Sequence, residues 1–116
     1  MTNGLEIRPA RAEDRDAVFA FCAQTWDDGD YIPEVWDTWL ADADGAFLAA
    51  VEDGRPVGII HLALLSPQEA WLEGIRVDPA ARRQGIGREL TARAMAIARE
   101  RGAVVARLFT SSDNTA

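Results

Sequence analysis

Residues 70–109 follow an order of hydrophobic patterns that few folds accommodate. Residues 70–77 favour a strand, and residues 104–109 favour another. Between them, apolar residues recur every three or four positions in a helix that Gly102 ends: Ile86, Leu90, Ala94 and Ile97. A helix that connects two neighbouring strands of one sheet makes them parallel, because the crossover returns the chain to the end of the sheet where the first strand began.

The rest of the chain predicts further strands and two more helices. The expected strands are 5–8, 47–51 and 56–65. The last two form a hairpin around Asp53 and Gly54. Helices are expected from Glu13 and from Pro33, and Gly74 predicts a bulge in the strand that contains it. The order strand, helix, helix, three strands, helix, strand predicts an α/β fold with a mixed sheet.

The composition is that of one ordinary domain. A length of 116 residues, 48% hydrophobic and 27% charged, supports a single domain over residues 1–116. No apolar run reaches the roughly 18 residues of a membrane helix, and the first residues lack a secretory signal, so we expect a cytoplasmic protein. One cysteine, Cys22, and one histidine, His61, exclude an intrachain disulfide and fall short of a structural zinc site. Cys22 is expected in the core.

All 12 basic residues are arginines, and they are unevenly placed. Residues 74–101 carry seven arginines against three acids, a net charge of +4 that leaves −11 for the remaining chain. An acidic protein with one basic segment argues against general nucleic-acid binding and for a small, localised anion site.

The basic segment contains the run Arg82-Arg83-Gln84-Gly85-Ile86-Gly87-Arg88, between a predicted strand and a predicted helix. The first turn of a helix has unpaired N–H groups and the positive end of the helix dipole. Glycines let phosphate oxygens approach the backbone, and arginines add charge-assisted hydrogen bonds. The run therefore predicts a site for a pyrophosphate group.

Three phosphate-binding loops compete for this run. A Walker A loop needs a lysine, which the chain lacks, and a dinucleotide-binding loop needs a third glycine where Leu90 stands. The pattern R/Q-x-x-G-x-G/A matches Arg82, Gly85 and Gly87, and here the sequence resembles the GNAT family of acyl-CoA N-acyltransferases. The order of elements and the strand within 71–79 are similar to that family over nearly the whole chain.

The resemblance implies an N-acetyltransferase that moves an acetyl group from acetyl-CoA to a primary amine of a small molecule or amino acid. It implies main-chain N–H groups of residues 83–88 on the pyrophosphate, the pantetheine arm along the preceding strand, and the Val77 N–H as oxyanion donor. The residues expected to bind the coenzyme are Ile75, Arg76, Val77, Arg82, Arg83, Gln84, Gly85, Ile86, Gly87, Arg88 and Asn114. No metal ion is expected.

Glu73 is the expected catalytic base, acting directly or through water, as a glutamate on this strand does in some members of the family. A primary amine of pKa near 10 is about 99.9% protonated at pH 7, so a proton acceptor is useful. The strand should be buried, and desolvation raises the pKa of a carboxylate. The alternative is an exposed glutamate, or one paired with Arg76 or Arg107. His61 is a second candidate base, although a half-buried structural histidine is commoner.

Residues 26–44 contain seven acids, four aromatic residues and no base. By the resemblance this region lines the acceptor side, and carboxylates with aromatic faces attract cations. The residues expected to receive a positively charged amine are Asp27, Asp28, Asp30 and Tyr31. Trp36 and Trp39 have helical spacing and are expected in the core. The string 29–33 is similar to a branch of the family that includes a histidine N-acetyltransferase, which leaves the substrate open.

Members of the family normally continue past the last predicted strand into another helix and one or two strands. This chain ends at Ala116, so we expect a GNAT-like fold truncated at its C-terminus, whose open sheet edge favours a homodimer. The alternative function is a non-catalytic CoA-binding or assembly module that kept the phosphate site and lost the reaction. A third possibility, a plain interaction domain, predicts no coenzyme binding.

Overall fold

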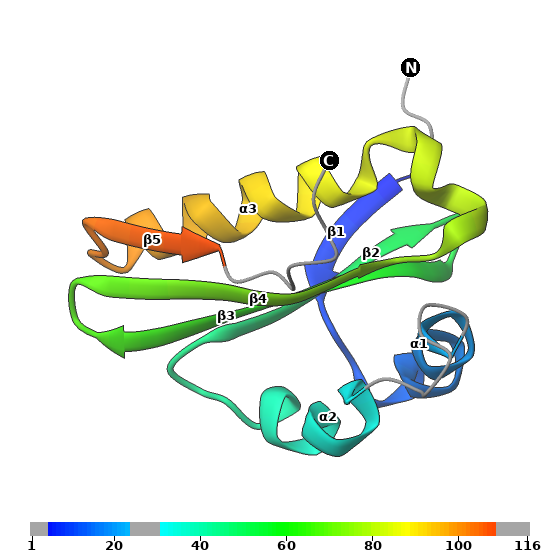
Figure 1. Ribbon diagram of the computed structural model, residues 1–116, viewed down its shortest axis with the longest axis horizontal. Coiled ribbons are helices and arrows are strands. Elements are labelled where there is room, and N and C mark those ends of the chain that lie inside the picture. The colour runs from blue at the N-terminus through cyan, green and yellow to red at the C-terminus, as the bar shows by residue number, and fades with distance from the viewer. Residues whose placement is uncertain (1–4, 24–30, 109–116) are drawn as a thin grey trace.

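A five-stranded sheet carries helices on both of its faces (Figure 1). The computed structural model describes residues 5–23 and 31–108. The strands are β1 (Leu5–Pro9), β2 (Ala46–Glu52), β3 (Arg55–Ser66), β4 (Glu69–Val77) and β5 (Val105–Leu108). The helices are α1 (Arg15–Cys22), α2 (Ile32–Leu40) and α3 (Ile86–Glu100), with short 3₁₀ helices at Ala12–Asp14 and Pro79–Gln84. Within these residues no helix is long and apolar enough to cross a membrane.

The strands lie side by side in chain order, β1-β2-β3-β4-β5. Neighbouring strands from β1 to β4 are antiparallel, and the β2–β3 hairpin turns at Asp53 and Gly54, which both have positive φ. β4 and β5 are parallel, with Trp71 opposite Arg107, and α3 connects them. The mixed α/β sheet, the hairpin and the parallel crossover predicted from the sequence are confirmed.

β4 contains the bulge that Gly74 predicted. The register of β4 against β3 shifts between Ile59 and His61. Gly74 has a φ of +66°, and a Cβ at this position would overlap the ring of Trp39, so both the backbone and α2 require glycine here. The bulge therefore lets α2 lie directly against the sheet.

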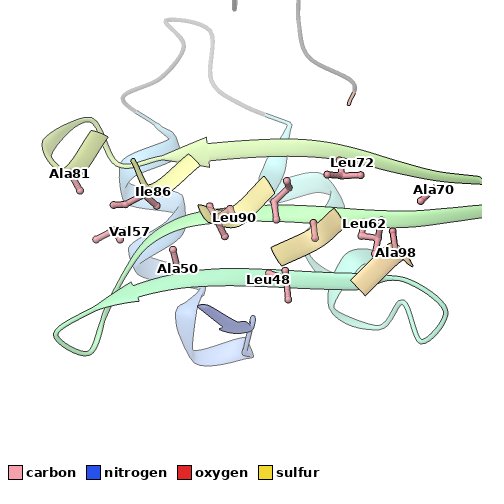
Figure 2. Packing of buried hydrophobic residues seen from close by; sticks show 12 residues of the cluster. Leu48, Ala50, Val57, Leu62, Ala70, Leu72, Ala81, Ile86, Leu90 and Ala98 are labelled. Atoms are coloured by element: carbon pink, nitrogen blue, oxygen red, sulfur yellow. The ribbon is translucent and has the colours of Figure 1, made fainter. Parts of the chain in front are cut away.

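Each face of the sheet has its own hydrophobic core. α3 covers one face, and α1 and α2 cover the other (Figure 1). Figure 2 shows Ile86, Leu90 and Ala98 of α3 over apolar residues of β2, β3 and β4. The core on the other face contains Val18, Phe21, Cys22, Ile32, Trp36, Trp39, Phe47 and Ile59. Burial of Cys22 and of both tryptophans of α2 confirms the predicted apolar faces of the first two helices.

Replacing Leu90 with alanine is expected to lower the free energy of unfolding by about 2–5 kcal/mol, because it leaves a cavity in a closed core. Leu90 is fully buried between α3 and the sheet. Met95→Ala, on the same helix but 38% exposed, is the matched control and should cost less than about 1 kcal/mol. Denaturant unfolding measures both losses, and equal losses would contradict this account of the core.

A buried ion pair at the start of α1 makes stability depend on pH. Arg8 donates two hydrogen bonds of 2.9 Å to the carboxylate of Asp14, which is 3% exposed. Burial raises the pKa of Asp14, but the bonds from Arg8 and from the Arg11 N–H outweigh burial, so this pKa lies below its usual value of 3.8. The stability that the pair adds is complete above the unfolded-state pKa and is lost as the pH falls through the folded-state pKa.

Asp14→Asn is therefore expected to flatten the loss of stability below about pH 4, because asparagine does not titrate. Denaturant midpoints of the wild type and the variant, measured from neutral to strongly acidic pH, test this. If the two pH profiles run parallel, Asp14 does not cause the loss of stability at acidic pH.

Candidate functional site

The turn before α3 places the predicted phosphate loop at the end of β4. Asp78 follows β4 and caps the helix Pro79–Gln84 by accepting a hydrogen bond from the Ala80 N–H (3.0 Å). Gly85 then has a φ of +72° and leads into α3, and a Cβ there would meet no atom of the described residues within 4 Å. The left-handed backbone favours glycine, and the space around it is open to a ligand.

The first turn of α3 lies against the end of β4. Ile86 is fully buried and anchors this turn to the sheet. A Cβ on Gly87 would lie 3.7 Å from the side chains of Ile75 and Val77. The N–H groups of the first turn have no acceptor within the helix and carry the positive end of its dipole. The loop, the helix start and β4 therefore form one surface with donors for an anion.

β4 has an open edge beside this surface. β5 pairs with Glu69–Leu72, and within the described residues the remaining half of β4, 73–77, has no strand partner on that side. The Asp78 N–H donates to the Val57 carbonyl of β3 (2.8 Å). The N–H groups of successive residues in a strand point to opposite edges of the strand, so the Val77 N–H points to the open edge of β4. This edge offers main-chain groups to an extended ligand.

Glu73 lies on the face of β4 that α2 covers. Its Oε2 is 2.9 Å from Nδ1 of His61, and its side chain is 27% exposed. The carboxylate is therefore partly buried and keeps some contact with solvent, which agrees only in part with the expected burial. The alternative of an arginine partner, Arg76 or Arg107, is not found, since the described partner of Glu73 is His61, while Arg107 bonds to Glu69 (3.0 Å).

His61 connects Glu73 to an acid that sequence reasoning did not select. Nε2 of His61 lies 2.9 Å from Oδ2 of Asp42. The ring is 3% exposed and stacks on Trp39 with 4.3 Å between ring centroids, so the expectation of a half-buried histidine is wrong. His61 and Glu73 are opposite in the register, but counting from the Ser66–Glu69 turn pairs His61 with Gly74, because the register shifts between Leu64 and Ser66. We find no signal in the sequence for Asp42.

Hydrogen bonds keep Asp42 ionised. Asp42 follows α2, and its Oδ1 accepts a hydrogen bond from the Gly45 N–H (3.1 Å). Partial burial raises the pKa of Asp42, but the bonds from Gly45 and from His61 outweigh burial, so this pKa lies below its usual value. The carboxylate is therefore charged at neutral pH.

Tyr31 and Arg76 lie together beside α2. The guanidinium carbon of Arg76 is 5.2 Å from the centroid of the Tyr31 ring, which is 43% exposed and packs edge-on against Trp39. Arg76 therefore extends toward the expected acceptor residue Tyr31. Four predicted site residues lie outside the described residues: Asp27, Asp28, Asp30 and Asn114. In the described part of the chain, no three acidic, histidine or cysteine residues are arranged to hold a metal ion.

Comparisons with known proteins find relatives of this chain. The family model described as "Acetyltransferase (GNAT) family" matches residues 11–116. Aminoglycoside N(6')-acetyltransferase type 1 of Stenotrophomonas maltophilia is 35% identical over 105 residues, which cover 83% of this chain and 69% of that protein. Histidine N-acetyltransferase of Oreochromis niloticus is 29% identical over 84 residues, which cover 72% of this chain and 25% of that protein. The match thus spans about a quarter of the length of the histidine N-acetyltransferase.

A solved structure has the same fold. The paia N-acetyltransferase of Thermoplasma acidophilum, in complex with coenzyme A, superposes with a TM-score of 0.76 at 22% identity. The superposition covers 99% of this chain and 83% of that one.

Proposed function

This chain belongs to the acetyltransferase (GNAT) family, and on that premise we propose that it transfers an acetyl group from acetyl-CoA to a primary amine of a small molecule or an amino acid. The proposal rests mainly on one observation: the first turn of α3 packs against the end of β4, where Gly87 lies beside Ile75 and Val77. One ligand can then reach both an anion site and an open strand edge. Acetyl-CoA has this form, because a pyrophosphate leads into an extended arm with two amides.

The donor occupies the turn and the strand edge. The main-chain N–H groups of residues 83–88 hold the pyrophosphate, and the arginines within 82–88 add positive charge. The pantetheine arm pairs with Ile75–Val77 like an added strand. The Val77 N–H donates to the thioester carbonyl and stabilises the oxyanion that forms on it.

Glu73 supplies the base for the acceptor. The amine nitrogen attacks the thioester carbon, which forms the C–N bond and places a negative charge on the carbonyl oxygen. The C–S bond then breaks, and coenzyme A leaves as a thiolate that takes up a proton. The nitrogen must lose its protons, and about 99.9% of a primary amine is protonated at pH 7. Glu73 accepts a proton directly or through water, and its 27% exposure leaves the carboxylate within reach.

The acceptor is a small cationic amine. Residues 26–44 carry seven acids and no base, and within this stretch Tyr31 has an exposed aromatic ring. The relatives named above are N-acetyltransferases of histidine and of aminoglycosides, two acceptors that carry amino groups. Asp27, Asp28, Asp30 and Tyr31 are the residues we assign to this amine.

Acetyl-CoA binding and turnover test the proposal separately. At 100 times its Kd, acetyl-CoA should raise the free energy of unfolding by about 2.7 kcal/mol, which is measured as a higher unfolding midpoint. Release of free thiol with a panel of amines, including histidine and an aminoglycoside, measures turnover. A raised midpoint without turnover supports the non-catalytic CoA-binding module instead. No change in midpoint for a cooperatively folded protein rejects acetyl-CoA as the ligand.

A further inference from the structure

His61 is enclosed so that both of its ring nitrogens are fixed. Nδ1 lies 2.9 Å from Oε2 of Glu73, and Nε2 lies 2.9 Å from Oδ2 of Asp42. Trp39 stacks on one side of the ring, and Phe47 meets it edge-on. The ring is 3% exposed and cannot turn without breaking both contacts. Each nitrogen therefore faces one carboxylate oxygen.

These two contacts require two protons. An ionised carboxylate only accepts hydrogen bonds, whereas a neutral imidazole donates at one nitrogen and accepts at the other. Two ionised carboxylates beside a neutral ring would leave lone pairs facing each other across one of the 2.9 Å contacts, which is repulsive in a buried site. Each contact therefore contains a proton.

The surroundings of Asp42 locate the first of these protons. Asp42 accepts the Gly45 N–H and keeps its charge at neutral pH, so the proton in its contact with the ring stays on Nε2. The second proton lies between Nδ1 and Oε2 of Glu73. Among the described residues, Asp42 and Glu73 are the charged groups that contact the ring, and two aromatic side chains pack around it.

We propose that Asp42, His61 and Glu73 share two protons in the resting protein, and that His61 is a positioning residue that holds Glu73 for its reaction. The positioning role rests on the proposed function, whereas the proton count does not. The shared protons make the trio one unit less negative than two carboxylates beside a neutral ring. The hydrogen bond to Nδ1 holds Oε2 of Glu73 against the ring, so Oε1 is the oxygen that accepts a proton from the acceptor amine.

The chain contains one histidine, so nuclear magnetic resonance can measure how many protons the three side chains share. In labelled wild-type protein at neutral pH, two-bond ¹H–¹⁵N spectra should show a proton on Nε2. Ring and carboxyl spectra together should place a second proton on Nδ1, beside an ionised Glu73 that can still accept a proton. A second proton on Glu73 instead would support the proton count and overturn the positioning role. A ring with one bare nitrogen beside an ionised Glu73 would overturn the proposal.

Two variants assign the protons. Asp42→Asn and Glu73→Gln each replace a carboxylate with an amide of the same shape, which can donate an N–H to the ring nitrogen that it faces. Asp42→Asn should therefore leave a single ring proton on Nδ1, and Glu73→Gln should leave a single ring proton on Nε2. If both variants carry their ring proton on the same nitrogen, the two carboxylates do not determine the protonation of the ring, and the proposal is wrong.

The positioning role has its own measurement. Asp42→Asn should lower kcat roughly 10- to 100-fold and leave the KM for acetyl-CoA unchanged, because it disturbs Glu73 without touching the coenzyme site. Asp44→Asn, an exposed acid in the same loop, is the matched control and should keep the wild-type kcat. A wild-type kcat in Asp42→Asn overturns the positioning role. If the wild type turns over no amine, the proposed function fails, and the proton count still decides whether the trio shares two protons.

Discussion

Replacing Glu73 with glutamine is expected to lower kcat by about 100-fold or more and to leave the Kd for acetyl-CoA unchanged. Glutamine has the shape of glutamate but cannot take up the proton of the acceptor amine. The coenzyme site should be intact, because Glu73 faces His61 and α2, whereas the first turn of α3 packs on the side chains of Ile75 and Val77. Single-turnover rates at saturating acetyl-CoA and amine measure the chemical step.

Glu69→Gln is the matched control on the same strand. Glu69 accepts hydrogen bonds from Arg107 (3.0 Å) and Trp71 (3.3 Å), in the half of β4 that pairs with β5. The kcat of the Glu69→Gln variant should stay close to that of the wild type. If Glu73→Gln also kept the wild-type rate, Glu73 would not be the base.

Replacing Gly85 with aspartate should abolish the stabilisation by acetyl-CoA, through a loss of affinity of about 100-fold or more, equivalent to about 2.7 kcal/mol. A carboxylate at the start of α3 accepts hydrogen bonds from the first-turn N–H groups, which are the donors that the pyrophosphate needs. It also places a negative charge beside the bound anion. A Cβ at this position meets no described atom within 4 Å, so the main structural cost is that of the left-handed backbone. Calorimetric titration and the unfolding midpoint measure the loss.

Gly102→Asp provides the matched control at the other end of α3. Gly102 also has a positive φ (+96°), so the strain and the added charge are of the same kind. α3 has 15 residues, which puts this end about 22 Å from the proposed anion site. This variant should lose some stability and keep its affinity for acetyl-CoA. A Gly85→Asp protein that acetyl-CoA stabilises like the wild type would place the pyrophosphate elsewhere.

The fold could be predicted in most of its parts because each part depends on neighbouring residues. The hairpin at Asp53 and Gly54 and the end of α3 at Gly102 use glycines or turn residues with positive φ, whose preferences are local. The bulge at Gly74 was predicted for the same reason, although its full cause, the ring of Trp39 in α2, lies far away in the chain. The parallel pairing of β4 with β5 followed from the crossover rule.

The candidate site was predicted less completely. Glu73 and His61 were each selected as bases, and the structure shows them hydrogen-bonded to each other. The pairing of Glu73 with His61 is not predicted, because side chains opposite each other in a hairpin depend on its register, and two irregularities shift the register of β3 against β4. The role of Gly85 in binding phosphate stays a prediction.

The sequence by itself determined the elements, their order and the glycines at the hairpin turn, the bulge and the end of the last helix, because these depend on hydrophobic period and on residues a few positions apart. Only the tertiary structure decided that His61 lies between Asp42 and Glu73, which are 19 and 12 positions away. A period-two pattern assigns a side chain to one face of a sheet. Which polar groups it meets there depends on the packing of α2 and its following loop against that face, and this packing brings together residues that no local pattern relates.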